Sequence, residues 1–150
     1  MLRFGVLGPL TVERESVSLA LPSGRARMLL GALIVDPGAA VSMDDLIDRL
    51  WGEAPPRTAV TALHGHVSRL RKMLGDDALL TIPNGYRLTV DADQVDSGRF
   101  RHLVAQAQQE RVASTRSSLL REALGLWRGP ALADFCYEVS AFVGCGLGRR

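Results

Sequence analysis

The sequence predicts an α+β fold, in which a short antiparallel sheet, three helices and a β-hairpin precede an all-α segment. Short runs with a period of two, separated by turn residues, fill the N-terminal part of the chain and are typical of antiparallel strands. From Ser23 onward the apolar residues recur every three or four positions, which is the period of a helix packed on one face. The dipeptide Asn84-Gly85 lies between two β-prone runs and is a strong hairpin signal.

The composition is that of a globular protein in a reducing compartment. Of the 150 residues, 47% are hydrophobic and 23% are charged, which excludes disorder as the main property of the chain. Two cysteines, Cys136 and Cys145, are too few for a disulfide framework. The longest apolar run, Met28 to Val35, has about half the length that a membrane span needs, and no signal peptide is visible. We therefore expect a cytoplasmic protein that does not act on a membrane.

Three strands are expected before the first helix. They cover Leu2 to Gly8, Leu10 to Glu13 and Val17 to Leu21, and each is short and alternating or rich in β-branched residues. The turn Gly8-Pro9 separates the first two strands, and polar residues separate the second from the third. This order predicts an antiparallel sheet.

Two helices are expected next. The first covers Arg25 to Asp36, because Ser23 can cap its start and Pro37 must end it. The second begins at Ser42, which with Asp45 comes close to a capping box, and it ends at the next glycine. Its apolar residues fall on one face, as in a helix packed against a core.

A third helix is expected from Arg57 to Leu74, because its apolar residues recur at spacings of three and four. That stripe consists of Val60, Leu63, Val67, Leu70 and Leu74. A hairpin follows, with strands over Leu79 to Ile82 and Tyr86 to Val90. Three helices followed by a hairpin is the element order of a winged helix-turn-helix.

Two more amphipathic helices are expected after Asp96, joined near Ala113 to Thr115 as an antiparallel pair. Their apolar stripes include Phe100, Leu103, Leu124 and Trp127. Two facing stripes hide only part of their surface, so this face must pack elsewhere or stay exposed. Because the linker Asp91 to Asp96 is short, we expect the face to pack on the N-terminal sheet.

The third helix has a small and basic surface opposite its apolar stripe. At about 100° per residue, this surface collects Thr58, Thr61, Ala62, Gly65, Ser68, Arg69 and Lys72, with Arg57, His64 and Arg71 at its flanks. No Asp or Glu occurs from Ala54 to Gly75. A helix that is merely solvated would mix charges of both signs, whereas one that enters a DNA major groove needs small and basic residues. The pattern favours DNA binding over a solvated face.

The expected DNA-binding residues lie on this helix and on the hairpin. They are Arg57, Thr58, Thr61, Gly65, Ser68, Arg69, Arg71, Lys72, Asn84 and Arg87. The hairpin residues could contact a phosphate or the minor groove, but on spacing alone an ordinary surface turn explains Asn84 equally well.

No pattern for an enzyme, a metal site or a cofactor is found. His64 and His66 are two residues apart on a helix and point in different directions, and neither cysteine has a histidine at ligand spacing. The run Gly144 to Gly148 resembles a dinucleotide loop only superficially, since no strand leads into it. Without a P-loop, a paired-carboxylate site or a nucleophile motif, we expect a protein that is not an enzyme and binds no cofactor.

Five segments carry a resemblance to a known family. They are LRFGVLGPLTV, GRARMLLGALIVDPGAAVSMDDLIDRLWGEAPPRTAVTALHGHVSRLRKMLG, TIPNGYRLTV, VDSGRFRHLVAQA and LLREALGLWRGPALADF. The first three resemble the OmpR-type DNA-binding domain of SARP-family regulators, the antibiotic regulatory proteins of actinobacteria. The last two resemble the start of their bacterial transcriptional activator domain, a tetratricopeptide-like helical array. The resemblance implies an OmpR-type winged helix over residues 1–92, a truncated activator segment over 96–142 and an irregular tail over 143–150.

The resemblance implies a transcriptional activator of secondary-metabolite, or antibiotic, biosynthesis genes. Such a protein binds direct repeats in double-stranded promoter DNA, could assemble there as a homo-oligomer, and helps to recruit RNA polymerase. The third helix would enter the major groove, the hairpin would touch the minor groove, and the loop from Gly52 to Arg57 would face the polymerase. Arg69 and Arg71 match the basic pair of the family's helix, and Tyr86-Arg87 match its closing wing strand.

A second hypothesis about the function remains open beside the DNA-binding activator. The winged helix and the helix pair could form a protein-interaction module in which DNA binding is vestigial. Salt dependence separates the two readings, because each phosphate contact adds about 0.9 to the log–log slope of DNA affinity against salt. We expect roughly 4 to 7 such contacts per protomer if the protein binds DNA.

Overall fold

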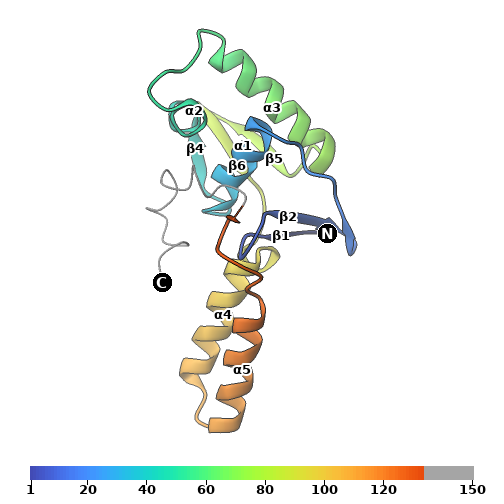
Figure 1. The fold of residues 1–150 in the computed structure, drawn as a ribbon, viewed down its shortest axis with the longest axis vertical. Helices are drawn as coiled ribbons and strands as arrows, with labels where there is room; N and C mark the ends of the chain where they lie inside the picture. The colour runs from blue at the N-terminus through green and yellow to red at the C-terminus, as the bar shows by residue number, and fades with distance from the viewer. Residues whose placement is uncertain (134–150) are drawn as a thin grey trace.

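The computed structural model describes residues 1–133, so the cysteines and the expected tail over 143–150 lie outside the described residues. In Figure 1, helices α1, α2 and α3 gather with strands β4, β5 and β6 in one part of the molecule. Strands β1 and β2 lie below them, and the pair α4 and α5 projects from the sheet as a stalk. The mixed α+β class predicted from the sequence is confirmed.

The N-terminal sheet is antiparallel with the strand order β1-β2-β3. Its strands are β1 (Leu2–Gly5), β2 (Thr11–Arg14) and β3 (Val17–Ser18). The turn between β2 and β3 holds Glu15 and Ser16 at φ 50° and 68°, the left-handed values that tight hairpin turns require. The three predicted strands are confirmed, and each is shorter than the sequence run that predicted it.

Three helices follow: α1 (Arg25–Ile34), α2 (Met43–Trp51) and α3 (Ala59–Leu74). The predicted cap of α2 is confirmed, since the Ser42 Oγ accepts a hydrogen bond of 3.1 Å from the Asp45 amide. The predicted cap of α1 is wrong. Gly24 stands at its N-terminus with φ 66° and no side chain caps that end, because the chain needs a positive φ there to turn into the helix.

The second sheet combines the predicted hairpin with a strand that the sequence analysis missed. Its strands are β4 (Ala40–Ser42), β5 (Leu79–Ile82) and β6 (Gly85–Leu88), in the antiparallel order β4-β6-β5. The hairpin turn consists of Pro83 and Asn84, and Asn84 takes φ 61°. Gly85 is the first residue of β6 and lies opposite Ser42 of β4. We call the β5–β6 hairpin the wing.

The core unites the three helices with both sheets. The buried stripe of α3 consists of Ala59, Leu63, Val67, Leu70 and Leu74. Val60, predicted to belong to it, is 47% exposed, because periodicity sets the direction of a stripe but not how far neighbouring elements cover it. Arg14 of β2 donates a hydrogen bond to the carbonyl of Leu74, which joins the N-terminal sheet to the end of α3.

The C-terminal elements are a short 3-10 helix η1 (Ala92–Gln94), α4 (Asp96–Gln109) and α5 (Ala113–Gly125). The predicted antiparallel pair is confirmed, and Phe100 and Trp127 meet edge to face with ring centroids 5.7 Å apart. The predicted joint near Ala113 to Thr115 is wrong, since α5 already begins at Ala113 and residues 110–112 connect the two helices. The expectation that the whole apolar face packs on the sheet is wrong. Leu124 is 65% exposed, since the pair meets the sheet at one end and projects away from it (Figure 1).

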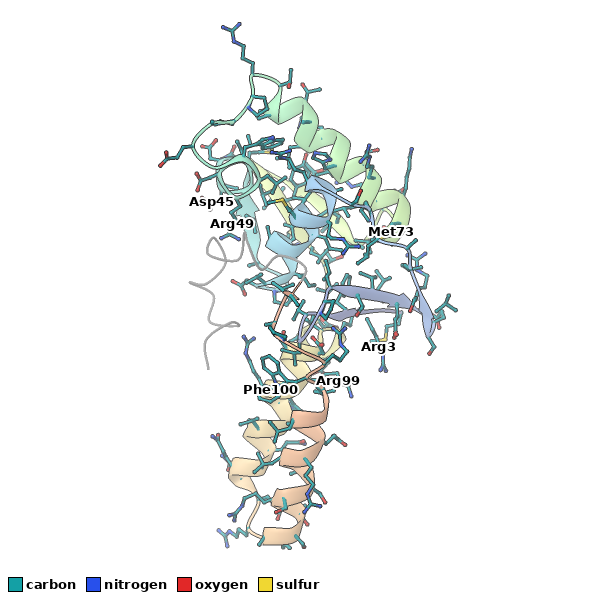
Figure 2. The ribbon with its side chains drawn as sticks, in the orientation of Figure 1. Arg3, Asp45, Arg49, Met73, Arg99 and Phe100 are labelled. Carbon is teal, nitrogen blue, oxygen red and sulfur yellow. The ribbon has the colours of Figure 1, made fainter. Side chains whose placement is uncertain are left out.

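At the junction between the helix pair and the first sheet, the groups bonded by Asp96 and Arg128 on the side of the sheet are backbone groups of the segment after β1. The Asp96 carboxylate accepts hydrogen bonds from the amides of Val6 (2.8 Å) and Leu7 (3.1 Å). After α5, the amide of Arg128 donates to the Leu7 carbonyl at 2.7 Å. Figure 2 shows Arg99 at this junction, at the base of α4. These bonds hold the base of the pair against the segment that follows β1.

Candidate nucleic-acid interface

Helix α3 presents an exposed polar face opposite its buried stripe. The structure exposes six residues there: Thr61, His64, Gly65, Ser68, Arg69 and Lys72. The predicted helix start at Arg57 is wrong by two residues, so the exposed Arg57 and Thr58 lie in the turn that precedes α3. A Cβ built on Gly65 would meet nothing within 4 Å, so the middle of the face is open and low. No acidic residue lies on α3, and its last turn carries Arg71 and Lys72. A helix with this surface can approach the edges of bases in a major groove.

A groove of about 480 Å³ runs between α3 and the wing. It is lined by His64, Val67, Ser68, Arg71, Lys72, Asp76, Thr81 and Tyr86. Hydroxyl groups from both elements and cationic groups from α3 therefore border one depression, together with the Asp76 carboxylate. Hydroxyl and cationic groups donate hydrogen bonds to phosphate oxygens.

Arg71 joins α3 to the wing. Its Nε donates to the Leu79 carbonyl at 3.0 Å, and its Nη2 donates to the Thr81 Oγ1 at 2.7 Å. The guanidinium lies 5.9 Å from the centroid of the Tyr86 ring, within the range of a cation–π contact. Burial raises the pKa of Tyr86, and the charge of Arg71 opposes that rise, so the phenol stays neutral. The side chain that was expected to contact DNA is thus engaged in holding the wing in place.

The opposite flank of α3 carries a cluster of aromatic and cationic side chains. The rings of His66 and Trp51 have centroids 6.3 Å apart, and the Arg25 guanidinium lies 5.3 Å from the Trp51 ring. The pKa of His66 is lowered, first by partial burial and then by the charges of Arg69 and Arg25. His66 is therefore neutral at neutral pH.

Sequence reasoning missed Arg25, which it used only to place the start of a helix. Arg25 is more than forty residues from His66 in the sequence. No periodicity relates the two positions, because the packing of α1, α2 and α3 brings them together on either side of Trp51.

The two wing residues lie apart from each other. Asn84 is exposed at the tip of the turn. Arg87 is exposed between the buried Tyr86 and Leu88, so it lies on the other face of the strand from Tyr86, which contacts Arg71. The structure therefore brings the α3 candidates together on one face and places Arg87 on the face of the wing that turns away from them.

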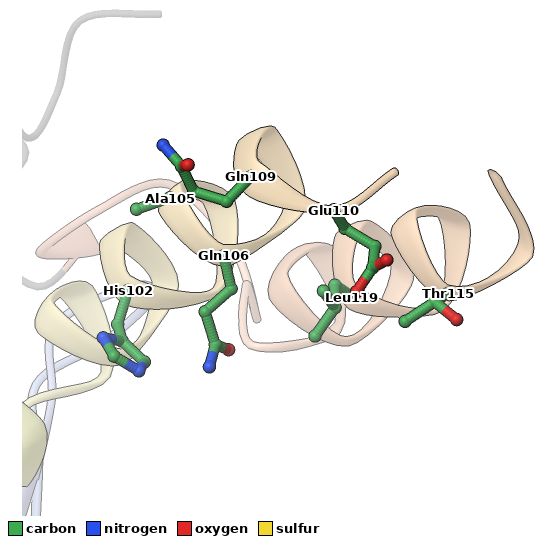
Figure 3. A pocket seen from close by; sticks show the side chains of 7 residues that line it. All are labelled: His102, Ala105, Gln106, Gln109, Glu110, Thr115 and Leu119. Carbon is green, nitrogen blue, oxygen red and sulfur yellow. The ribbon is translucent and has the colours of Figure 1, made fainter. Parts of the chain in front are cut away.

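Among residues 1–133, no three His, Cys, Asp or Glu side chains are arranged to hold a metal ion. In the same part of the chain, every helix is too short or too polar to span a bilayer. An open groove of about 540 Å³ lies between α4 and α5, with His102 and Glu110 toward its two ends (Figure 3). His102 lies within α4, whereas Glu110 follows the last residue of that helix.

Two family descriptions match the chain. Residues 18–88 match "Transcriptional regulatory protein, C terminal", and residues 95–142 match "Bacterial transcriptional activator domain". The boundary between the two matches falls at η1, where the winged part ends and the helix pair begins. The first match starts at β3 and leaves β1 and β2 outside it.

Proteins with sequences similar to this chain include regulators of Streptomyces and Mycobacterium species. The transcriptional regulator RedD of Streptomyces coelicolor is 39% identical over 86% of this chain and 40% of its own length. The regulatory protein AfsR of Streptomyces griseus is 39% identical over 89% of this chain and 14% of its own. A structure of Mycobacterium tuberculosis EmbR, in complex with a low-affinity phosphopeptide, superposes with a TM-score of 0.89 at 32% identity, covering 96% of this chain and 40% of EmbR. The chain thus spans less than half the length of these relatives.

Proposed function

Because this chain belongs to the SARP family of transcriptional regulators, we propose that it is a sequence-specific DNA-binding protein that activates transcription. The observation that carries the proposal is the exposed face of α3. Small, hydroxyl and cationic residues share that face, no acid lies on the helix, and the wing stands beside it. We infer that α3 enters the major groove, as second helices of helix-turn-helix units do.

The side chains on this face have different proposed roles. Arg69 follows Gly65 by one turn on the exposed face, toward the flank that carries His66, and is within reach of base edges. Lys72 and Ser68 border the groove toward the wing and are suited to phosphate contacts. Arg71 positions the wing relative to α3 through its two hydrogen bonds. Asn84 and Arg87 are proposed to contact the DNA backbone from the wing.

The proposed targets are direct repeats in the promoters of antibiotic biosynthesis genes. This follows from the family resemblance, as does assembly of two copies side by side on the DNA. A selection from random duplexes would identify the operator, and a repeated half-site in the selected sequences would support both statements.

A protein-interaction module with vestigial DNA binding is the second candidate, and the exposed Leu120 and Leu124 of α5 favour it. The salt dependence of DNA affinity decides between the two functions. For the DNA-binding activator, the log–log slope against salt corresponds to roughly 4 to 7 phosphate contacts per protomer. A slope near zero would contradict DNA binding and leave the interaction module.

Replacing Arg69 with alanine is expected to weaken operator binding by about 1–3 kcal/mol, the usual loss for one base or phosphate fork. The side chain points away from the buried stripe, so the melting temperature should not change. Fluorescence anisotropy with the selected operator measures the loss. Arg101→Ala, at an exposed site on α4, is the matched control. A folded Arg69→Ala protein with unchanged affinity would remove Arg69 from the proposed interface.

Exchanging Glu53 to Pro56 for a Gly/Ser segment is expected to reduce activation and to spare DNA affinity. All four residues are exposed between α2 and α3, and the prolines hold the loop extended without an N–H to donate. We propose this loop as the RNA polymerase contact. In vitro transcription and operator binding are measured on the same preparation. Parallel losses in both assays would count against a separate activation surface.

A further inference from the structure

Arg25, the first residue of α1, is held in one position by two neighbours from α2. Its guanidinium lies 5.3 Å from the centroid of the Trp51 ring, and its Nε donates a hydrogen bond of 3.2 Å to the Leu50 carbonyl. A guanidinium held over an indole through its ring contact and its Nε bond still has its Nη groups as hydrogen-bond donors. Among the described residues, no acceptor is bonded to its Nη atoms and no carboxylate forms an ion pair with it.

Arg25 adjoins the flank of α3 on which Arg69 lies. Trp51 contacts Arg25 through its ring and also faces His66 of α3, with ring centroids 6.3 Å apart. The charges that act on His66 are Arg69 and Arg25, both positive. Neighbouring side chains therefore connect the open face of α3 with the start of α1, in the order Arg69, His66, Trp51 and Arg25.

We propose that Arg25 binds a backbone phosphate of double-stranded DNA, beside the major groove that α3 enters. The inference rests on the proposed function and extends the interface to α1, where no residue was expected from the sequence. Arg25 has what such a contact needs: an exposed, unpaired cation with a forked set of donors that match a phosphate. Its stacking on Trp51 lowers the entropy lost when it binds. Because every sequence has a phosphate there, this contact adds affinity without sequence preference.

The test measures affinity for a labelled duplex of arbitrary sequence over a series of salt concentrations. The whole chain is compared with Arg25→Ala, Arg25→Gln and, as a matched control, Arg121→Ala on the exposed side of α5. Loss of one phosphate contact should make the log–log slope shallower by about 0.9. If the variant and the unaltered chain bind equally at about 1 M salt, this change in slope corresponds to about a fivefold lower affinity of the variant at about 0.15 M salt. The preference for operator over arbitrary DNA should not change.

The outcomes separate this inference from the proposed function. If the unaltered chain binds DNA with a steep salt slope and both Arg25 variants keep that slope, the phosphate contact is refuted and the function stands. A loss of affinity with an unchanged slope would mean that Arg25 acts only by packing on Trp51, which also refutes it. If the unaltered chain shows no salt-dependent binding, both are refuted. Arg25→Gln retains a hydrogen-bonding side chain without the charge, so it guards against a result caused by misfolding of the alanine variant.

Discussion

Replacing Gly85 with alanine is expected to lower the free energy of unfolding by about 3 kcal/mol, at the upper end of typical overpacking costs. A Cβ built on Gly85 would overlap the Val41 carbonyl oxygen and lie 3.0 Å from the Ser42 Cα. These neighbours are backbone atoms of β4, so no side-chain rotation can relieve the overlap. The strand β4 would have to move away from β6, and the wing would lose its attachment to the chain that leads into α2.

Gly65→Ala is the matched control, because the same methyl group would there meet nothing within 4 Å. Replacement of a glycine inside a helix by alanine should stabilise the protein by about 0.5–1 kcal/mol. Urea denaturation of both variants gives the two values. Equal stability of Gly85→Ala and the unaltered chain would show that β4 and β6 can separate without cost, contrary to the packing described.

Replacing Asp96 with alanine is expected to cost about 2–4 kcal/mol and to release the helix pair from the first sheet. The Asp96 side chain is only 12% exposed and accepts hydrogen bonds from the amides of Val6 and Leu7, both of which are buried. Without the carboxylate, two buried N–H groups have no acceptor, and Arg128 loses its neighbouring negative charge. The desolvation penalty of those groups is the source of the loss.

Limited proteolysis measures the release directly. Cleavage of Asp96→Ala within the linker over 91–95 should be much faster than in the unaltered chain and should leave a stable fragment of about residues 1–92. Asp93→Ala is the matched control, since Asp93 is exposed and lies in η1, just before Asp96. If the two variants are cleaved at the same rate, two other bonds are sufficient to hold the junction. They are those from the Gln94 side-chain amide to the Leu2 carbonyl and from the Arg128 backbone amide to the Leu7 carbonyl.

Local signals predicted most of the secondary structure. The capping pattern at Ser42 and the turn residues before Gly85 located α2 and the wing. The same kind of reasoning failed where another part of the chain decides the outcome. The strand β4 is three residues long and exists because it pairs with β6, which follows it by more than forty residues. Likewise, Val60 has the periodicity of a core residue, yet its neighbours leave it 47% exposed.

The sequence by itself determined the fold class of this protein and which face of α3 is buried. Both follow from short-range rules, since an apolar stripe must be buried and the acid-free surface opposite it must then face solvent. Only the tertiary structure decided what the individual arginines do. The sequence does not distinguish the contacts of Arg69, Arg71 and Arg25. In the structure, Arg71 is hydrogen-bonded to the wing and Arg25 lies over the Trp51 ring of α2. The partner of a long charged side chain depends on which backbone carbonyl or ring lies within reach, and packing between distant elements sets that.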